Sequence, residues 1–78
     1  MKIKLNNVKR VPISTDYIKL DSLLKFTAIA STGGEAKTMI MEGDVFVDGE
    51  PCTMRGKKII PGNVVRFGNT MFLVAKHK

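Results

Sequence analysis

The chain has one cysteine, one histidine, one tyrosine and no tryptophan among its 78 residues. A single thiol, that of Cys52, cannot form an internal disulfide or a zinc site, so a disulfide-stapled secreted scaffold is excluded. Apart from the tyrosine, four phenylalanines are the only aromatic residues. This number is too small for a cofactor cage or for an aromatic platform on which bases stack.

Long apolar segments are also missing. The longest uninterrupted apolar run covers residues 71–75, whereas roughly 20 residues are needed to cross a bilayer. The basic N-terminal segment lacks the apolar stretch that a secretion signal carries. We therefore expect a cytoplasmic protein that does not enter the membrane.

Residues typical of catalytic sites are scarce. His77 lies in a terminal Lys-His-Lys segment, and no histidine is near Cys52 in sequence to activate its thiol. We interpret Cys52 as a buried structural thiol. Phosphate-loop and dinucleotide-binding motifs are absent from the sequence. The chain is therefore not expected to be an enzyme or to use a cofactor, a metal or a small-molecule substrate.

Basic residues are in excess. Thirteen Lys and Arg against seven Asp and Glu give a formal net charge of +6 and a pI of about 9.8. Residues 51–78 carry six cations and no carboxylate, whereas residues 21–50 carry two cations and six carboxylates. The positive field thus belongs to the two ends of the chain. A polyanion is the partner that this balance predicts, nucleic acid before an anionic membrane.

The middle of the sequence predicts two short helices. Leu20, Leu23, Leu24 and Ala28 recur at helical spacing, and Asp21 is a suitable N-cap for the first helix. Residues 31–34 then interrupt the pattern.

The second helix begins with a capping box. Thr32 and Glu35 match the pattern in which each side chain accepts the other residue's backbone N–H. An apolar stripe follows and ends at Gly43, a typical C-terminal glycine.

Gly33 and Gly34 fall in the first turn of this helix and cost up to about 1 kcal/mol each relative to alanine. One interpretation is that bare backbone N–H groups at a helix N-terminus approach a phosphate closely. The other is that only glycine fits the tight turn between the helices. We favour the second, because Glu35 places a negative charge where the phosphate would lie.

After Gly43 the hydrophobic period changes from helical to alternating. Residues 45–47, 59–60, 64–67 and 71–74 read as short strands, and Asp48-Gly49 predicts a hairpin turn of the primed type. Residues 1–12 would add a strand or an arm, in which Pro12 indicates a sheet edge. The expected fold is one α+β domain over residues 1–78. It consists of a two-helix hairpin packed on a small, mostly antiparallel sheet of four to five short strands.

The strongest basic cluster is the segment Met54-Arg55-Gly56-Lys57-Lys58. Three cations in four residues around a glycine form a loop that can follow a phosphate backbone. Alternatively, this is a solvated hairpin loop whose lysines protect a sheet edge from aggregation. The lack of carboxylates over residues 51–78 favours contact with nucleic acid.

Four segments together form a known pattern: Lys19-Leu20-Asp21, residues 32–40, residues 42–49 with the sequence EGDVFVDG, and residues 61–65 with the sequence PGNVV. Over residues 17–67 the chain therefore resembles the S4 domain, an RNA-binding module with an αL motif that is named for a small-subunit ribosomal protein. Residues 33–37 and 55–58 look closest to the small free-standing bacterial YaaA-like proteins.

The resemblance implies that the second helix and the adjacent hairpin form a surface for structured RNA, often ribosomal RNA. Lys19 takes the place of a basic residue before Leu-Asp, and Lys37 that of a basic residue after alanine. The family usually has Ser-Arg where this chain has Thr32-Gly33. Its usual Asn-Gly-Lys turn is here the more acidic Asp-Gly-Glu of residues 48–50. More of the RNA contact is therefore expected from the basic loop.

We predict non-catalytic binding of structured or ribosomal RNA through the basic hairpin loop and the second helix. Recognition is expected by shape and phosphate, because few aromatic side chains are available to stack bases. The predicted RNA contacts are Lys19, Lys25, Thr32, Gly33, Lys37, Arg55, Lys57 and Lys58.

The alternative is a protein-interaction module on a ribosomal or nucleoid partner, with the acidic middle of the chain facing that partner. DNA binding without sequence preference is a weaker rival. The sequence does not determine the oligomeric state, and a monomer is the expectation.

Overall fold

The computed structural model describes residues 8–77, so residues 1–7 of the strand or arm expected at residues 1–12 lie outside the described residues. Two helices and seven strands follow one another along the described chain. They are β1 (Val8–Ile13), β2 (Ile18–Lys19), α1 (Leu20–Phe26), α2 (Gly33–Met41), β3 (Val45–Val47), β4 (Glu50–Pro51), β5 (Lys58–Ile59), β6 (Val64–Phe67) and β7 (Thr70–Lys76).

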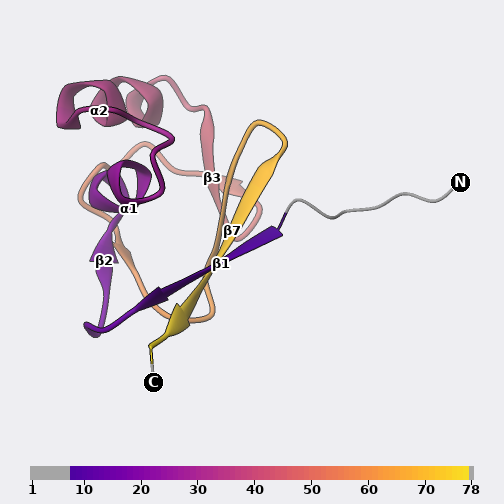
Figure 1. The fold of residues 1–78 in the computed structure, drawn as a ribbon. Coiled ribbons are helices and arrows are strands. Elements are labelled where there is room, and N and C mark those ends of the chain that lie inside the picture. The colour runs from indigo at the N-terminus through magenta and orange to yellow at the C-terminus, as the bar shows by residue number, and fades with distance from the viewer. Residues whose placement is uncertain (1–7, 78) are drawn as a thin grey trace, which may run out of the picture.

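Five of the strands form one mixed sheet in the order β1-β7-β6-β3-β4 (Figure 1). β1 pairs with β7 in parallel, and the other neighbours in this sheet are antiparallel. β2 and β5 form a separate antiparallel pair. The predicted α+β fold with a mostly antiparallel sheet is confirmed, and Pro12 lies in the edge strand β1 as expected.

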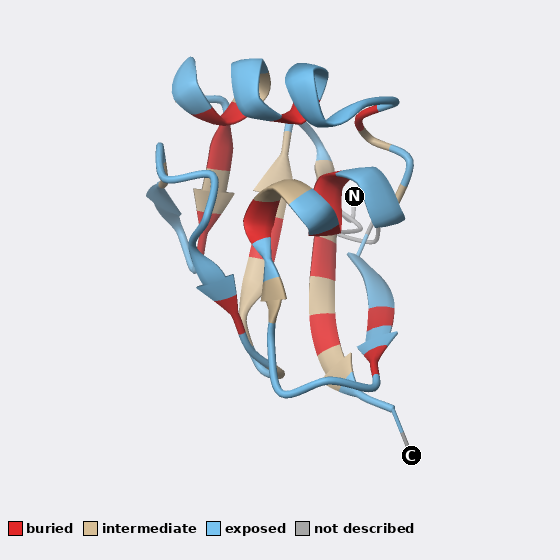
Figure 2. Ribbon diagram, turned by 90° about the vertical axis from the view of Figure 1, so that its left-hand side faces the viewer, coloured by how far each residue is buried: buried red, intermediate tan, exposed pale blue. Residues whose placement is uncertain are grey.

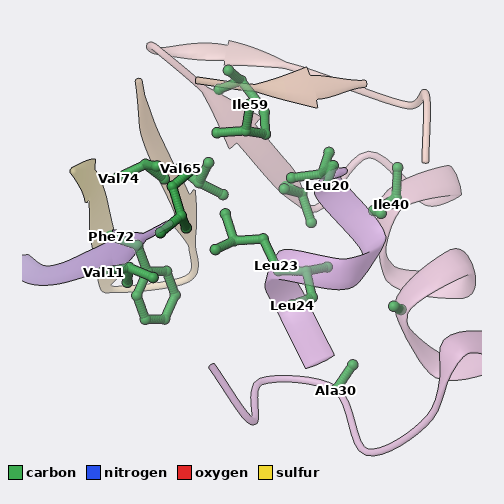
Figure 3. Close-up of a cluster of buried hydrophobic side chains, with 14 residues drawn as sticks. Val11, Leu20, Leu23, Leu24, Ala30, Ile40, Ile59, Val65, Phe72 and Val74 are labelled. Atoms are coloured by element: carbon green, nitrogen blue, oxygen red, sulfur yellow. The ribbon is translucent and has the colours of Figure 1, made fainter. Parts of the chain in front are cut away.

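Both helices lie on the same side of the five-stranded sheet (Figures 1 and 2). The hydrophobic core lies between the helices and the sheet. Leu23 of α1 points toward Val65 on β6 and Phe72 and Val74 on β7 (Figure 3). Leu24 is buried on the side of α1 that faces Ala30 and α2. In the described part of the chain, neither helix is long and apolar enough to cross a membrane.

The start of α1 differs from the prediction. Asp21 is not the N-cap, because the helix begins at Leu20, and the N-cap position belongs to Lys19, whose side chain makes no capping hydrogen bond. Backbone carbonyls from a later segment of the chain satisfy the first N–H groups instead, as described below. The predicted apolar position Ala28 is exposed with a φ of 66°, and Ala30 is buried in its place.

The start of α2 follows the predicted capping box with one difference. The Thr32 hydroxyl accepts the Glu35 N–H at 3.1 Å. The Glu35 carboxylate accepts the N–H of Ser31 at 2.6 Å, and not that of Thr32 as expected. The helix ends before Gly43, whose φ of 81° gives the left-handed conformation predicted for a C-terminal glycine.

The β3–β4 hairpin has the predicted primed turn. Asp48 and Gly49 have φ values of 52° and 89°, and only a type I′ turn places both central residues in this region. Asp48 also links the hairpin to the chain before β6. Its carboxylate accepts the Asn63 side-chain amide at 2.8 Å and the Val64 N–H at 2.9 Å.

Candidate nucleic-acid interface

The basic loop, residues 54–58, is fixed to the start of α1 by its backbone. The Lys57 N–H donates to the Met54 carbonyl at 3.1 Å, which closes a tight turn with Arg55 at its tip. The carbonyls of Lys57 and Arg55 accept the N–H groups of Leu20 and Asp21 at 2.9 and 3.1 Å. The loop therefore turns its carbonyls toward the helix, and its charged residues are exposed to solvent.

Lys19 and Lys58 lie directly opposite each other in the β2–β5 pair. Like charges at such positions are destabilising, and both residues are exposed. The Lys58 ammonium also lies 4.9 Å from the centre of the Tyr17 ring, an attractive cation–π distance. The strand pairing thus adds Lys19, distant in sequence, to the cations of the basic loop.

One carboxylate belongs to this cluster. Arg55 Nε lies 3.5 Å from Asp21 Oδ2. The Asp21 side chain is 19% exposed and that of Arg55 is 54% exposed. The arginine is therefore held over the first turn of α1 while more than half of its side chain stays accessible to a ligand.

The other predicted contacts lie on the two helices. Lys25 is exposed four residues after Asp21, and residues at this spacing share one helix face. Lys37 is exposed on α2, and no hydrogen bond or ion pair joins α2 to the basic loop among residues 8–77. The structure thus groups Lys19, Arg55, Lys57 and Lys58, with Lys25 one turn away. The other predicted contacts are separate from this group: Gly33 and Lys37 lie on α2, and Thr32 is its N-cap residue.

The interpretation that only glycine fits the start of α2 is wrong. A Cβ atom added to Gly33 would meet nothing within 4 Å, and at Gly34 it would meet only the Thr32 hydroxyl at 3.9 Å. Neither glycine has a positive φ. Because the fold does not require glycine here, the bare first turn of α2 is open to a ligand on steric grounds.

A cavity beside the basic loop was not predicted from the sequence. It has a volume of about 490 Å³, and Lys57 of the basic loop forms part of its wall. Met54 of the same loop also lines it, and the other lining residues come from the β3–β4 hairpin, the segment after it and the chain before β6. Local sequence patterns do not reveal it, because its wall is formed by several turns and strands within residues 47–63 that come together only in the folded chain. The lining residues are Val47, Asp48, Glu50, Pro51, Cys52, Thr53, Met54, Lys57 and Asn63.

Cys52 is half-buried and not fully buried as predicted. It packs against the core, and its Sγ lies 3.8 Å from the Met54 carbonyl. The thiol therefore combines the expected packing role with a position on the cavity wall.

Comparisons with known proteins agree with the architecture. Residues 11–75 match the sequence model of the S4 domain. A Bacillus subtilis (strain 168) protein named as a probable ribosome maturation protein, RlbA, is 38% identical over 55 residues, which is 70% of this chain and 78% of that protein. YbcJ of Escherichia coli (strain K12), which carries the provisional name of an RNA-binding protein, is 38% identical over 60 residues, which is 76% of this chain and 86% of that protein.

Proposed function

The chain belongs to the S4 domain family, and on this premise we propose that it binds structured RNA, ribosomal RNA foremost, without catalysing a reaction. The names of its relatives support the choice of ligand, since one refers to RNA binding and another to ribosome maturation. The proposed contacts are the basic loop, Lys19 and Lys25, with Thr32, Gly33 and Lys37 on α2 at the margin.

The observation that carries the proposal is the pairing of Lys19 with Lys58 beside the basic loop. Two opposed lysines repel each other in the free protein, and a phosphate placed between them would turn this repulsion into attraction. The backbone hydrogen bonds of the loop to α1 hold Arg55 and Lys57 close to the same strand pair. Such a cluster suits a phosphate backbone, which protein cations contact without reading sequence.

Three alanine substitutions in the basic loop test this proposal. The variant R55A/K57A/K58A keeps the carbonyls that cap α1, so its fold is expected to persist. The plot of log affinity against log salt should become shallower by about two, because each lost phosphate contact removes roughly 0.7–0.9 from the slope. Filter binding of a hairpin RNA at several salt concentrations measures this change.

A control variant removes the same charge elsewhere. Lys9 and Arg10 are exposed on the edge strand β1 of the five-stranded sheet, and Lys76 is exposed on the neighbouring strand β7. The variant K9A/R10A/K76A should retain nearly the wild-type slope. If both triple variants lose affinity equally, the effect is one of net charge and the basic loop is not the contact. If the wild type does not bind RNA, the alternative of a protein-interaction module replaces this proposal.

A further inference from the structure

We propose that the cavity beside the basic loop receives one unpaired nucleobase of the bound RNA, and that this base is guanine. The inference rests on the proposed function and adds base recognition to it. The cavity volume of about 490 Å³ falls in the range of roughly 300–1,000 Å³ that small-molecule sites occupy. It is therefore large enough to hold a single base.

Lys57 connects the cavity to the phosphate contacts. It belongs to the basic loop and also lines the cavity. A phosphate bound at the loop would therefore bring its own nucleotide to the cavity mouth. Unpaired bases in loops and bulges are the usual targets of sequence-specific RNA recognition, because their edges are free for hydrogen bonding.

Apolar side chains supply part of the cavity wall. Pro51, Cys52 and Met54 line it, and Met54 is 64% exposed although it is a large apolar residue. The fold gains little from a methionine at this position. A flexible thioether at the mouth of the cavity would instead cover the flat face of an inserted base.

The polar groups of the cavity differ in how far they are already used. The Asp48 carboxylate accepts hydrogen bonds from Asn63 and Val64, and the Asn63 side-chain oxygen accepts the Ile60 N–H. In the described part of the chain, the side chains of Glu50 and Lys57 have no hydrogen-bond or ion-pair partner. A free carboxylate and a free ammonium thus line the same cavity.

This pair matches the Watson–Crick edge of guanine. Guanine presents two adjacent donors, N1–H and N2–H₂, beside the acceptor O6, so a carboxylate can accept both N–H groups while an ammonium donates to O6. Adenine, cytosine and uracil each present a single donor group on this edge. The Glu50 carboxylate repels the phosphates of any RNA that binds the nearby basic loop. Recognition of guanine would explain why an acidic residue is present at this position.

Five hairpin RNAs with one common stem test the inference. One is fully paired, and the others carry a single unpaired G, A, C or U. The wild type should bind the RNA with the unpaired G about tenfold more tightly than the fully paired one, because a good bidentate contact discriminates by about 1–3 kcal/mol. In the variant E50Q this ratio should fall close to one, because an amide offers only one acceptor atom.

The variant E42Q is the matched control. Glu42 is exposed at the C-terminal end of α2, away from the cavity lining. Both variants lose one negative charge, and the electrostatic gain in affinity that follows is common to all five RNAs. It therefore cancels in the ratio between RNAs, and this ratio isolates the cavity. E42Q should keep the preference for the unpaired G.

The outcomes separate this inference from the proposed function. Equal binding of all five RNAs by the wild type overturns the inference and leaves RNA binding in place. A preference for another unpaired base, or a guanine preference that survives in E50Q, also overturns it. Failure of the wild type to bind any of the five removes the proposed function and this inference together.

Discussion

The backbone carbonyl of Lys57 accepts the N–H of Leu20 at 2.9 Å, and through this bond the basic loop caps the first helix. A helix start is usually capped by a nearby Ser, Thr, Asp or Asn side chain. Here the cap comes from a turn more than thirty residues later in the chain. The loop is therefore held in place before any ligand arrives, and little conformational entropy remains to be lost on binding.

Replacement of Asp21 is expected to strengthen RNA binding while it weakens the fold slightly. The variant D21A removes an acidic residue from the first turn of α1, which costs about 0.3–1 kcal/mol of unfolding free energy. It also frees Arg55 from the carboxylate at 3.5 Å. RNA affinity should rise by up to about fivefold, because exposed ion pairs are worth at most about 1 kcal/mol. Urea unfolding and filter binding measure the two effects.

Asp16 provides the comparison for this variant. Its carboxylate lies 3.7 Å from Lys76, so D16A removes the same charge outside the proposed interface. RNA affinity should change much less in D16A, above all near 0.15 M salt, where the screening length is about 8 Å. Equal gains in both variants would contradict a local role for Asp21 and Arg55.

An arginine at position 33 is expected to add a phosphate contact. The family pattern has a basic residue here, and a side chain on Gly33 has free space around it. The variant G33R should therefore steepen the plot of log affinity against log salt by roughly 0.7–0.9. The variant M41R gains the same charge at the exposed other end of α2. If M41R changes the slope as much as G33R, the start of α2 does not contact RNA.

The cap of α2 is expected to serve stability. Thr32 accepts the Glu35 N–H through its hydroxyl, and loss of such a cap costs about 0.5–2 kcal/mol. T32A should lower the unfolding free energy by this amount, with little change in RNA affinity where the variant remains folded. A collapse of affinity at an unchanged melting temperature would assign the Thr32 hydroxyl to the ligand instead.

Folded RNA is expected to bind better than an unstructured strand of equal length. The proposed interface offers cations in a fixed arrangement, and among residues 8–77 Tyr17 is the only aromatic residue in contact with one of its lysines. Binding of single strands usually depends on several aromatic side chains that stack on bases. Competition between a hairpin RNA and an unstructured strand at one salt concentration decides the matter, and equal affinities would contradict recognition by shape.

Local sequence patterns predicted the local structure well. The Asp48-Gly49 turn, the Thr32 cap and the end of α2 at Gly43 are all present, because each depends on residues only a few positions apart. The glycines at the start of α2 were explained by a steric need that does not exist. A sequence shows that glycine costs helix stability, but not whether neighbouring atoms leave space for a side chain.

Features that depend on distant segments were not predicted. The cap that Lys57 gives to Leu20 and the pairing of Lys19 with Lys58 both join segments separated by most of the helical region. The cavity beside the loop was not predicted either, although all of its lining residues lie between residues 47 and 63. The basic loop was predicted from its charge, whereas the arrangement of its neighbours follows only from the tertiary structure.

The pairing of β1 with β7 affects the order in which the protein can fold. Its parallel register joins Val8 to Met71 and Ile13 to Lys76, contacts that span nearly the whole chain. Such long-range contacts form slowly, and during synthesis β1 must wait until the ribosome has made β7. The helices and the basic loop are joined by contacts over shorter sequence distances, such as that of Leu20 with Lys57. In a growing chain, the basic loop can therefore reach its place on the first helix while the edge of the sheet is still incomplete.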